Sequence, residues 1–375
     1  MSDDWESVSR RRMAHQGLTA PLGSVAQVPD AVRAMCGAHA QVQSAAEHSI
    51  ARRLEGVTCA DVQASLWERR ELVRTYGPRG TVHLLPAADL HLWVGALTAL
   101  DGGTSRQAVG VRLDEGQVDD VVAAVAAVLA DDELTLTELD AAIGKTLGAW
   151  AVEETMPAFG TFWPRWRQAV TVAAHRGALC FGRPRGRAVT YTSPAAWLPG
   201  FQPAPAEVAV PWLVASYRAA YGPSEPRHLA RWLATSESWA RAAWAAASGG
   251  SEQGAPAAVD HDRQPAVPEV VLLPYFDAYV VAAQPREQLF PGRAAERALA
   301  GSQAGNFPVL LVRGVVAGVW HGKRSGARMD VRVEPLEPLA AGLDDALADE
   351  VARIGEIVQA RAELTIGNIT VGPHA

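Results

Sequence analysis

The sequence repeats one order of elements three times, and this repetition limits the folds that the chain can adopt. The first copy contains three stretches of helical composition and two alternating stretches around the turn GPRG, at residues 28–37, 44–56, 58–70, 71–76 and 81–86. Thr58 stands three residues before Asp61, which is a capping signal for the third helix. The alternating stretches predict a β-hairpin. Helices followed by a hairpin are typical of a winged helix-turn-helix unit.

The second copy has the same order of elements. Helices are expected over residues 118–132, 134–147 and 163–177. Thr137, three residues before Asp140, marks the expected start of the second of these helices. The following stretch, ALCFGRPRGRAVTYTSP, predicts two strands around a turn rich in Gly, Pro and Arg. The tip of such a wing is where a winged helix usually meets phosphates.

The third copy supplies helices, and the character of the chain then changes to strands. Helices are expected over 210–223 and 225–247, followed by the polar linker 248–268 instead of a clear wing. Later stretches predict strands over 269–281, strands around an Arg313-Gly314 turn within 306–336, a helix over 344–364 and a last strand over 365–371. This last part is expected to be a small mixed domain that resembles a β-barrel.

The predicted fold class is therefore α+β and mainly helical. It consists of three tandem winged helix-turn-helix units and a C-terminal domain of the β-barrel type. The expected boundaries are 1–100, 101–200, 201–268 including the linker, and 269–375.

Composition limits the location of the protein and its cofactors. The chain of 375 residues is 49% hydrophobic and 20% charged, and no segment has 18 uninterrupted apolar residues. We therefore expect a cytoplasmic protein with no membrane partner. Cys36, Cys59 and Cys180 lie far apart without a CxxC pair, and the ten histidines include no HExxH. Neither a metal nor a cofactor is expected.

The charges are segregated along the chain. The net charge is −7, which disfavours a nucleic-acid partner when it is considered alone. However, residues 155–206 contain no Asp or Glu, and HGKRSGAR forms a second basic cluster. The acidic excess lies in 114–154 and 334–363. This distribution fits a basic face that binds DNA and an acidic back. A solvated surface without a partner is the open alternative.

Histidine and tryptophan side chains offer weaker candidates. The chain has twelve Trp residues, and pairs at helical spacing such as Trp163 and Trp166 are usually core residues. His83 lies on a predicted strand, where a histidine is more often part of the structure than a functional group.

Two glutamines form an unusual pair in GAHAQVQSAAE. Gln41 and Gln43 are spaced i, i+2 before a predicted helix, so in an extended loop both side chains project to the same face. Two amides can hold a water, a base edge or a phosphate. Without further context, hydration of two surface side chains is the better explanation for them.

Four stretches in a fixed order resemble a known family. GAHAQVQSAAE, LVRTYGPRGTVHLLPAADL, LLPYFDAYV and LVRGVVAGVW together resemble the bacterial winged-helix DNA-binding protein family that contains the AlkZ-type DNA glycosylases. The sequence is more distantly similar to the YcaQ-type enzymes. The resemblance extends from about Val28 to Val371, and the QVQ and RGTVHLL stretches are its most specific parts.

The resemblance implies a fold and a catalytic motif. The AlkZ-type members of this family have three tandem winged-helix units with a concave DNA-binding surface and a C-terminal β-barrel. Their motif is Gln, apolar residue, Gln, which Gln41-Val42-Gln43 matches residue for residue. YcaQ-type relatives have Asp in the last place, so Gln43 indicates the AlkZ branch. Many members have Gln where this chain has His39, so no role is transferred to His39.

The implied reaction suits two amides. An N7-alkylated purine is cationic, so the glycosidic bond is weakened and the leaving base needs no protonation. Gln41 and Gln43 would place a water at C1′ and stabilise the sugar cation. The chain has only Lys145 and Lys323, neither close to the motif in sequence, so a Schiff-base lyase step is not expected. We expect a monofunctional glycosylase for bulky N7 adducts, which could include interstrand crosslinks, in DNA repair or self-resistance to a genotoxic natural product.

The expected partner is double-stranded DNA with alkylated bases, bound by a monomer. Nine side chains are expected to contact DNA: Arg79, His83, Arg165, Arg183, Arg185, Arg187, Lys323, Arg324 and Arg328. Two alternatives remain open at this point. Winged helices are mostly regulatory, so a non-catalytic regulator or damage-binding factor is one, and a protein-interaction scaffold is the other.

Overall fold

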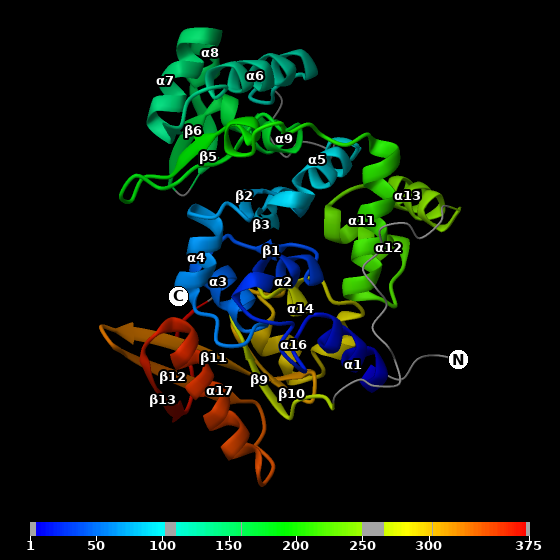
Figure 1. The fold of residues 1–375 in the computed structure, drawn as a ribbon, viewed down its shortest axis with the longest axis vertical. Coiled ribbons are helices and arrows are strands. Elements are labelled where there is room, and N and C mark those ends of the chain that lie inside the picture. The colour runs from blue at the N-terminus through cyan, green and yellow to red at the C-terminus, as the bar shows by residue number, and fades with distance from the viewer. Residues whose placement is uncertain (1–4, 102–109, 159, 250–265, 302, 373–375) are drawn as a thin grey trace. The chain divides into compact units, whose positions relative to one another are not determined.

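The computed structural model describes residues 5–101, 110–158, 160–249, 266–301 and 303–372 (Figure 1). The chain forms two compact units, each assembled from separated segments. The first unit contains Met1–Arg69, Ala215–His228 and Gln253–Ala375, and the second contains Arg70–Val214 and Leu229–Glu252. The secondary structure is mixed α and β, as predicted, and roughly half of the chain is helical, where a mainly helical chain was expected.

The first unit begins with four helices, and a local capping signal sets the start of the fourth. These helices are α1 (Trp5–His15), α2 (Val28–Ala34), α3 (Gln43–Ala51) and α4 (Cys59–Trp67). The predicted cap of α4 is confirmed, because Thr58 Oγ1 accepts from the Asp61 backbone N–H and Asp61 accepts from the Thr58 N–H at 2.9 Å. The short strand β1 (Ala38–His39) precedes α3.

A five-stranded sheet forms the other half of the first unit (Figure 1). Its order is β13-β12-β11-β10-β9, and only β12 and β13 run parallel. The strands are β9 (Val270–Leu273), β10 (Val309–Val312), β11 (Val315–Ser325), β12 (Arg328–Pro335) and β13 (Arg361–Ile366). The expected barrel is therefore an open, curled sheet. The turn at Arg313 and Gly314 is confirmed, and both residues have positive φ.

The two faces of this sheet bury two separate apolar clusters. Along β9, Val271 and Leu273 belong to one cluster, and Val270 and Leu272 belong to the other. The first cluster includes residues of α14 (Ala278–Val281), α15 (Arg286–Leu289) and α16 (Arg293–Ala298). The second includes Leu343, Leu347, Val351 and Ile354 from one side of α17 (Leu343–Val358). Both faces of β9 are buried, which explains its uninterrupted apolar sequence.

Three boundaries in this part differ from the predictions. The stretch expected as strand over 269–281 ends as a strand at Leu273, because Asp277 then caps α14 through the Tyr279 backbone N–H. The helix expected over 344–364 ends at Val358, where Gln359 adopts a left-handed conformation. The chain then turns into β13, which starts four residues earlier than expected and pairs with β12.

The second unit contains the predicted hairpin and a group of helices. β2 (Leu72–Tyr76) pairs antiparallel with β3 (Val82–Pro86), as expected. The helices are α5 (Leu90–Thr98), α6 (Glu115–Val128), α7 (Leu136–Leu147), α8 (Ala149–Val152), α9 (Val170–His175), α10 (Pro194–Trp197), α11 (Ala206–Tyr221), α12 (Pro226–Leu233) and α13 (Glu237–Gly249). The division between the units falls inside α11 and α12. The polar linker lies mostly outside the described residues.

The short strands of the second unit form two further sheets. β4 (Leu134–Thr135), β8 (Thr190–Thr192) and β7 (Cys180–Phe181) make one sheet, in which β7 and β8 are the expected wing strands. β5 (Glu154–Ala158) and β6 (Thr161–Pro164) form a hairpin that was not predicted. The helix expected over 163–177 is consequently shortened. Trp163 pairs with Met156, a 3₁₀ turn follows over Arg165–Ala169, and α9 starts only at Val170.

The predicted cap of α7 is wrong by two residues. Thr135 Oγ1 accepts from the Glu138 N–H, and Glu138 accepts from the Thr135 N–H at 2.7 Å. Asp140, the expected partner of Thr137, is instead engaged by Trp166 Nε1 at 2.8 Å and by Arg167. Both T-x-x-acid pairs fit the capping pattern, and the tertiary contacts of Asp140 decide between them.

Within the described part of the chain, no helix has both the length and the apolar character needed to cross a bilayer. The three cysteines are free thiols, and burial raises the pKa of each of them. No group of three or more potential metal-binding side chains occurs among the residues that could be searched.

Candidate functional site

The two glutamines lie at the junction between β1 and α3 of the first unit. Gln41 is exposed in the connecting loop, and Gln43 is the half-buried first residue of α3. Val42 is the N-cap, with extended backbone angles, and its carbonyl accepts from the Ala45 and Ala46 N–H groups at 3.1 and 3.2 Å. The expectation of an extended loop thus holds up to Val42, and the helix starts one residue earlier than predicted.

A buried carboxylate fixes the amide of Gln43. Gln43 Nε2 donates to Glu47 Oε1 at 2.9 Å, and Gln63 Nε2 of α4 donates to Glu47 Oε2 at 2.9 Å. Glu47 is only 2% exposed. Because the nitrogen of the Gln43 amide is directed at Glu47, its carbonyl oxygen is left as the acceptor on the other side of the amide. This oxygen can accept a hydrogen bond from a water or face a developing cation.

Sequence reasoning did not identify Glu47. The available signal was its spacing, because Gln43 and Glu47 are four residues apart and neighbours at that distance meet on a helix surface. The predicted extended conformation of Gln43 hid this relationship.

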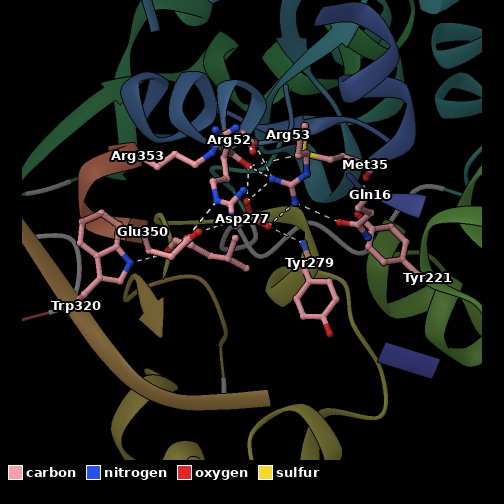
Figure 2. Close-up of polar contacts among 12 residues, drawn as sticks. Gln16, Met35, Arg52, Arg53, Tyr221, Asp277, Tyr279, Trp320, Glu350 and Arg353 are labelled. Atoms are coloured by element: carbon pink, nitrogen blue, oxygen red, sulfur yellow. Dashed lines mark hydrogen bonds and ion pairs between the residues drawn. The ribbon is translucent and has the colours of Figure 1, made fainter. Parts of the chain in front are cut away.

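The end of α3 is held by a buried ion pair, which Figure 2 shows together with its neighbours. Arg53 Nη1 and Nη2 donate to the Asp277 carboxylate at 2.8 and 2.9 Å, and both side chains are 0% exposed. Ser49 of α3 also donates to Asp277. Burial alone would raise the pKa of Asp277, but the charge of Arg53 and these hydrogen bonds outweigh it and lower the pKa. Asp277 is therefore held as a carboxylate.

A second ion pair ties the same end of α3 to α17 (Figure 2). Arg52 Nη2 lies 2.7 Å from Glu350 Oε1, and Glu350 also accepts from the Leu272 N–H of β9 at 3.0 Å. Arg353 Nη2 donates to the backbone oxygens of Arg52 and Leu54 at 3.2 and 2.7 Å. These contacts connect the glutamine-bearing helix to the five-stranded sheet of the first unit.

Two histidines near the motif belong to the core of the first unit. His39 is 8% exposed, and its ring lies against Phe276 with 4.6 Å between centroids. His48 meets Trp320 edge-on at 6.0 Å. Burial, reinforced by the charges of Arg52 and Arg353, lowers the pKa of His48 to about 4. His48 is consequently neutral at neutral pH.

The basic candidates of the first unit lie on the β11–β12 hairpin. Lys323, Arg324 and Arg328 are exposed, and the register places Lys323 opposite Asp330. Arg324 donates to the backbone oxygens of Gly326 and Val358 at 3.1 and 3.0 Å. The pKa of the Cys59 thiol, raised to about 12 chiefly by burial, also reflects the charges of Glu47 and Arg324.

The arginines predicted on the second unit fall into two groups. Arg165 is paired with Glu153 at 2.6 Å, and Arg185 with Glu138 at 3.1 Å. Arg183 and Arg187 are exposed at the β7–β8 turn, and within the described residues neither guanidinium is paired with a carboxylate, although the Arg183 backbone N–H donates to Glu133 at 3.3 Å. A DNA phosphate would compete with a carboxylate for Arg165 and Arg185, but not for the side chains of Arg183 and Arg187.

Arg79 and His83 lie on the β2–β3 hairpin of the second unit. Arg79 is half-buried, donates to the Trp232 backbone oxygen at 3.1 Å and lines a cavity of about 1280 Å³. His83 is 3% exposed, with Nδ1 2.9 Å from the Thr81 carbonyl oxygen. This burial favours a structural role for His83 over a DNA contact.

Comparison with known proteins places these features in a family. Residues 32–357 match the family described as DNA glycosylase AlkZ-like. An interstrand DNA cross-link repair glycosylase of Streptomyces sahachiroi is 31% identical over 245 residues, which span 62% of this chain and 61% of that relative. The solved structure of Streptomyces sahachiroi DNA glycosylase AlkZ has the same fold, with a TM-score of 0.80, 24% identity and coverage of 98% of this chain and 100% of that one. With the family match covering most of its length, the chain belongs to the AlkZ-like DNA glycosylase family, as its sequence motifs predicted.

Proposed function

We propose that this protein is a monofunctional DNA glycosylase that hydrolyses the N-glycosidic bond of N7-alkylated purines, including bulky adducts and interstrand crosslinks. The observation that carries the proposal is the position of Gln41 and Gln43 at the start of α3, with the Gln43 amide fixed by Glu47. Membership of the AlkZ-like family supports the reaction class. The name of the Streptomyces relative, an interstrand cross-link repair glycosylase, supports the substrate class.

The chemistry follows from the charge of the substrate. An N7-alkylated purine already carries a positive charge, so it leaves as a neutral base without a proton from the enzyme. The carbonyl oxygen of Gln43 would accept from the attacking water and turn its negative end toward the oxocarbenium-like sugar. The exposed Gln41 would contact the same water or the sugar. Neither amide can accept the proton of the water as a carboxylate would, which restricts the enzyme to substrates with a good leaving group.

DNA is proposed to be held by basic side chains of both units. Arg183 and Arg187 at the β7–β8 turn, and Lys323, Arg324 and Arg328 on the β11–β12 hairpin, are exposed and suited to phosphates. The three repeats, the third of which lacks a clear wing, would act as winged-helix units in this interaction. A cellular role in DNA repair or in self-resistance to a DNA-alkylating natural product is consistent with such a substrate.

The proposal is tested by measuring base release. Duplexes that contain N7-methylguanine, a bulky N7 adduct or an N7-linked crosslink are incubated with the protein, and free modified base and abasic sites are quantified. Gln41→Ala and Gln43→Ala are expected to lower the single-turnover rate by roughly 10²- to 10³-fold. Gln202→Ala, which changes an exposed glutamine of the second unit, is the matched control.

Three outcomes separate the parts of the proposal. Absence of base release from all three duplexes would contradict the enzyme assignment and favour a DNA-binding protein without catalysis. Release that survives both substitutions would contradict the site assignment alone. Release from N7-methylguanine without release from the crosslink would restrict the substrate class.

A further inference from the structure

The Glu47 carboxylate orients the Gln43 side chain and connects it to the neighbouring helix α4. Glu47 lies one turn after Gln43 in α3 and receives hydrogen bonds from Gln43 and from Gln63 of α4, each at 2.9 Å. The carboxylate is 2% exposed, although Gln43 is half-buried and Gln63 is exposed. A carboxylate in this setting is well shielded from competing water.

We propose that Glu47 is a positioning residue that selects which end of the Gln43 amide faces the DNA. This inference rests on the proposed function, because it assigns a task to the Gln43 carbonyl oxygen. An ionised carboxylate can only accept hydrogen bonds. Glu47 therefore binds the NH₂ end of the Gln43 amide and disfavours the flipped amide, which would bring two oxygens into contact. The carbonyl oxygen is left to face the water and the sugar.

The selection matters because the two ends of an amide have opposite polarity. With the carbonyl oxygen outward, Gln43 presents the negative end of its dipole to the developing sugar cation. With the NH₂ outward, it would present two donors, which cannot accept the hydrogen bond of the attacking water. The family motif therefore needs a partner outside its own three residues, and Gln63 helps by fixing the second oxygen of that partner.

The substitution Glu47→Gln separates orientation from packing. It retains the volume of the side chain but replaces an obligate acceptor with an amide that can donate or accept. Gln43 then loses its preferred orientation, and a charge-assisted hydrogen bond is replaced by a neutral one. We expect the single-turnover rate of base release to fall by roughly 10- to 100-fold. The dissociation constant for undamaged duplex DNA is expected to stay within about twofold, because Glu47 is buried and does not contact DNA in this scheme.

A double-mutant cycle shows whether Glu47 acts through Gln43. The rate is measured for Glu47→Gln, Gln43→Ala and the double variant. Glu47→Gln should have little further effect in the Gln43→Ala background. A purely structural role would lower the rate by the same factor in both backgrounds and would overturn the proposal. Glu55→Gln removes an exposed carboxylate that follows the same helix and is the matched control.

A spectroscopic readout keeps the inference independent of catalysis. The side-chain NH₂ resonances of Gln43, assigned by their loss in Gln43→Ala, should shift in Glu47→Gln and remain in place in Glu55→Gln. Unshifted resonances would contradict the assigned contact even in a protein that releases no base. A shift without any base release by the wild-type protein would instead contradict the proposed function alone. Should Glu47→Gln not fold, Gln63→Ala tests the same contact from α4, with a smaller fall in rate that also disappears in the Gln43→Ala background.

Discussion

Arg53 and Asp277 form a fully buried ion pair although 224 residues separate them in the chain. Arg53 follows the helix that carries Gln43 and Glu47, and Asp277 caps α14. The pair therefore fastens the glutamine-bearing helix to the C-terminal part of the first unit. Ser49 contributes a third hydrogen bond to the same carboxylate, so the position of α3 depends on charge pairing as well as on apolar packing.

Removing one partner of this pair should be strongly destabilising. Asp277→Ala leaves the Arg53 guanidinium buried without its counter-charge, which typically costs about 3–5 kcal/mol. The free energy of unfolding is measured by denaturant titration. Glu337→Ala, which breaks the exposed pair with Arg293, should change it little. Equal effects of the two substitutions would show that the buried pair does not anchor the helix.

Two histidines, the buried His48 and the half-buried His175, should make the protein less stable in mild acid. Burial lowers the pKa of His48 and of His175 to about 4 in each case, below the unfolded value near 6.5. As the pH falls from about 6.5 to 4, the unfolded chain binds protons that the folded chain does not. Stability is therefore lost across this window, by roughly 1 kcal/mol per pH unit for each histidine.

The histidine effect can be isolated by substitution. His48→Gln should flatten the dependence of the unfolding free energy on pH between 7 and 5, and His91→Gln, at an exposed position, should not. The pKa of Asp277 is depressed, so the stability that its carboxylate contributes is lost only at lower pH, when this group is protonated. Measurements above pH 5 therefore report on the histidines. A slope that does not differ between His48→Gln and the wild type would contradict this prediction.

The cap of α7 offers a comparison of two threonines two residues apart. Thr135 accepts from the Glu138 backbone N–H, whereas Thr137 is exposed within the helix. Thr135→Ala should cost about 1 kcal/mol of unfolding free energy, the typical value for a lost N-cap. Thr137→Ala should be close to neutral, because alanine has the higher helix propensity. The reverse order would favour the cap that the sequence pattern predicted.

Two helical glycines should respond in opposite directions to alanine. A Cβ on Gly95 of α5 would lie 2.2 Å from the Ala204 backbone oxygen, so Gly95→Ala must displace backbone and should be destabilising by about 1–3 kcal/mol. A Cβ on Gly116 of α6 would meet Asp114 at 3.4 Å, an ordinary contact. Gly116→Ala should raise the melting temperature slightly, because alanine favours the helix.

The salt dependence of DNA binding should distinguish paired from unpaired arginines. Arg187 is exposed and has no acidic partner within the described residues, whereas Arg165 is 17% exposed and is held by Glu153 at 2.6 Å. If Arg187 contacts a phosphate, the logarithm of the DNA association constant should fall less steeply with the logarithm of the salt concentration in Arg187→Ala. The slope should become less negative by about 1. Arg165→Ala should change the slope less. Equal slopes for wild type and Arg187→Ala would remove Arg187 from the interface.

Local signals predicted most element positions but not every boundary. The Thr58 cap, the β2–β3 hairpin and the Arg313-Gly314 turn depend on a few adjacent residues, and all three are confirmed. The Thr137 cap failed because partners 26 and 27 residues away in the sequence hold Asp140. The helix over 163–177 is shortened for a local reason, because its first residue joins a hairpin that the alternation pattern did not reveal. Asp140 is occupied by Trp166 and Arg167, and Trp163 is drawn into pairing with Met156.

The sequence by itself determined the family, much of the order of elements and the candidate pair Gln41 and Gln43. Only the tertiary structure decided how that pair is supported: Glu47 is tied to Gln63 of another helix, and Arg53 to a carboxylate near the other end of the chain. The reason is physical. Capping and turn formation are short-range, so they can be recognised in a linear pattern, whereas burial, ion pairing and the orientation of an amide depend on which distant segments the fold brings together.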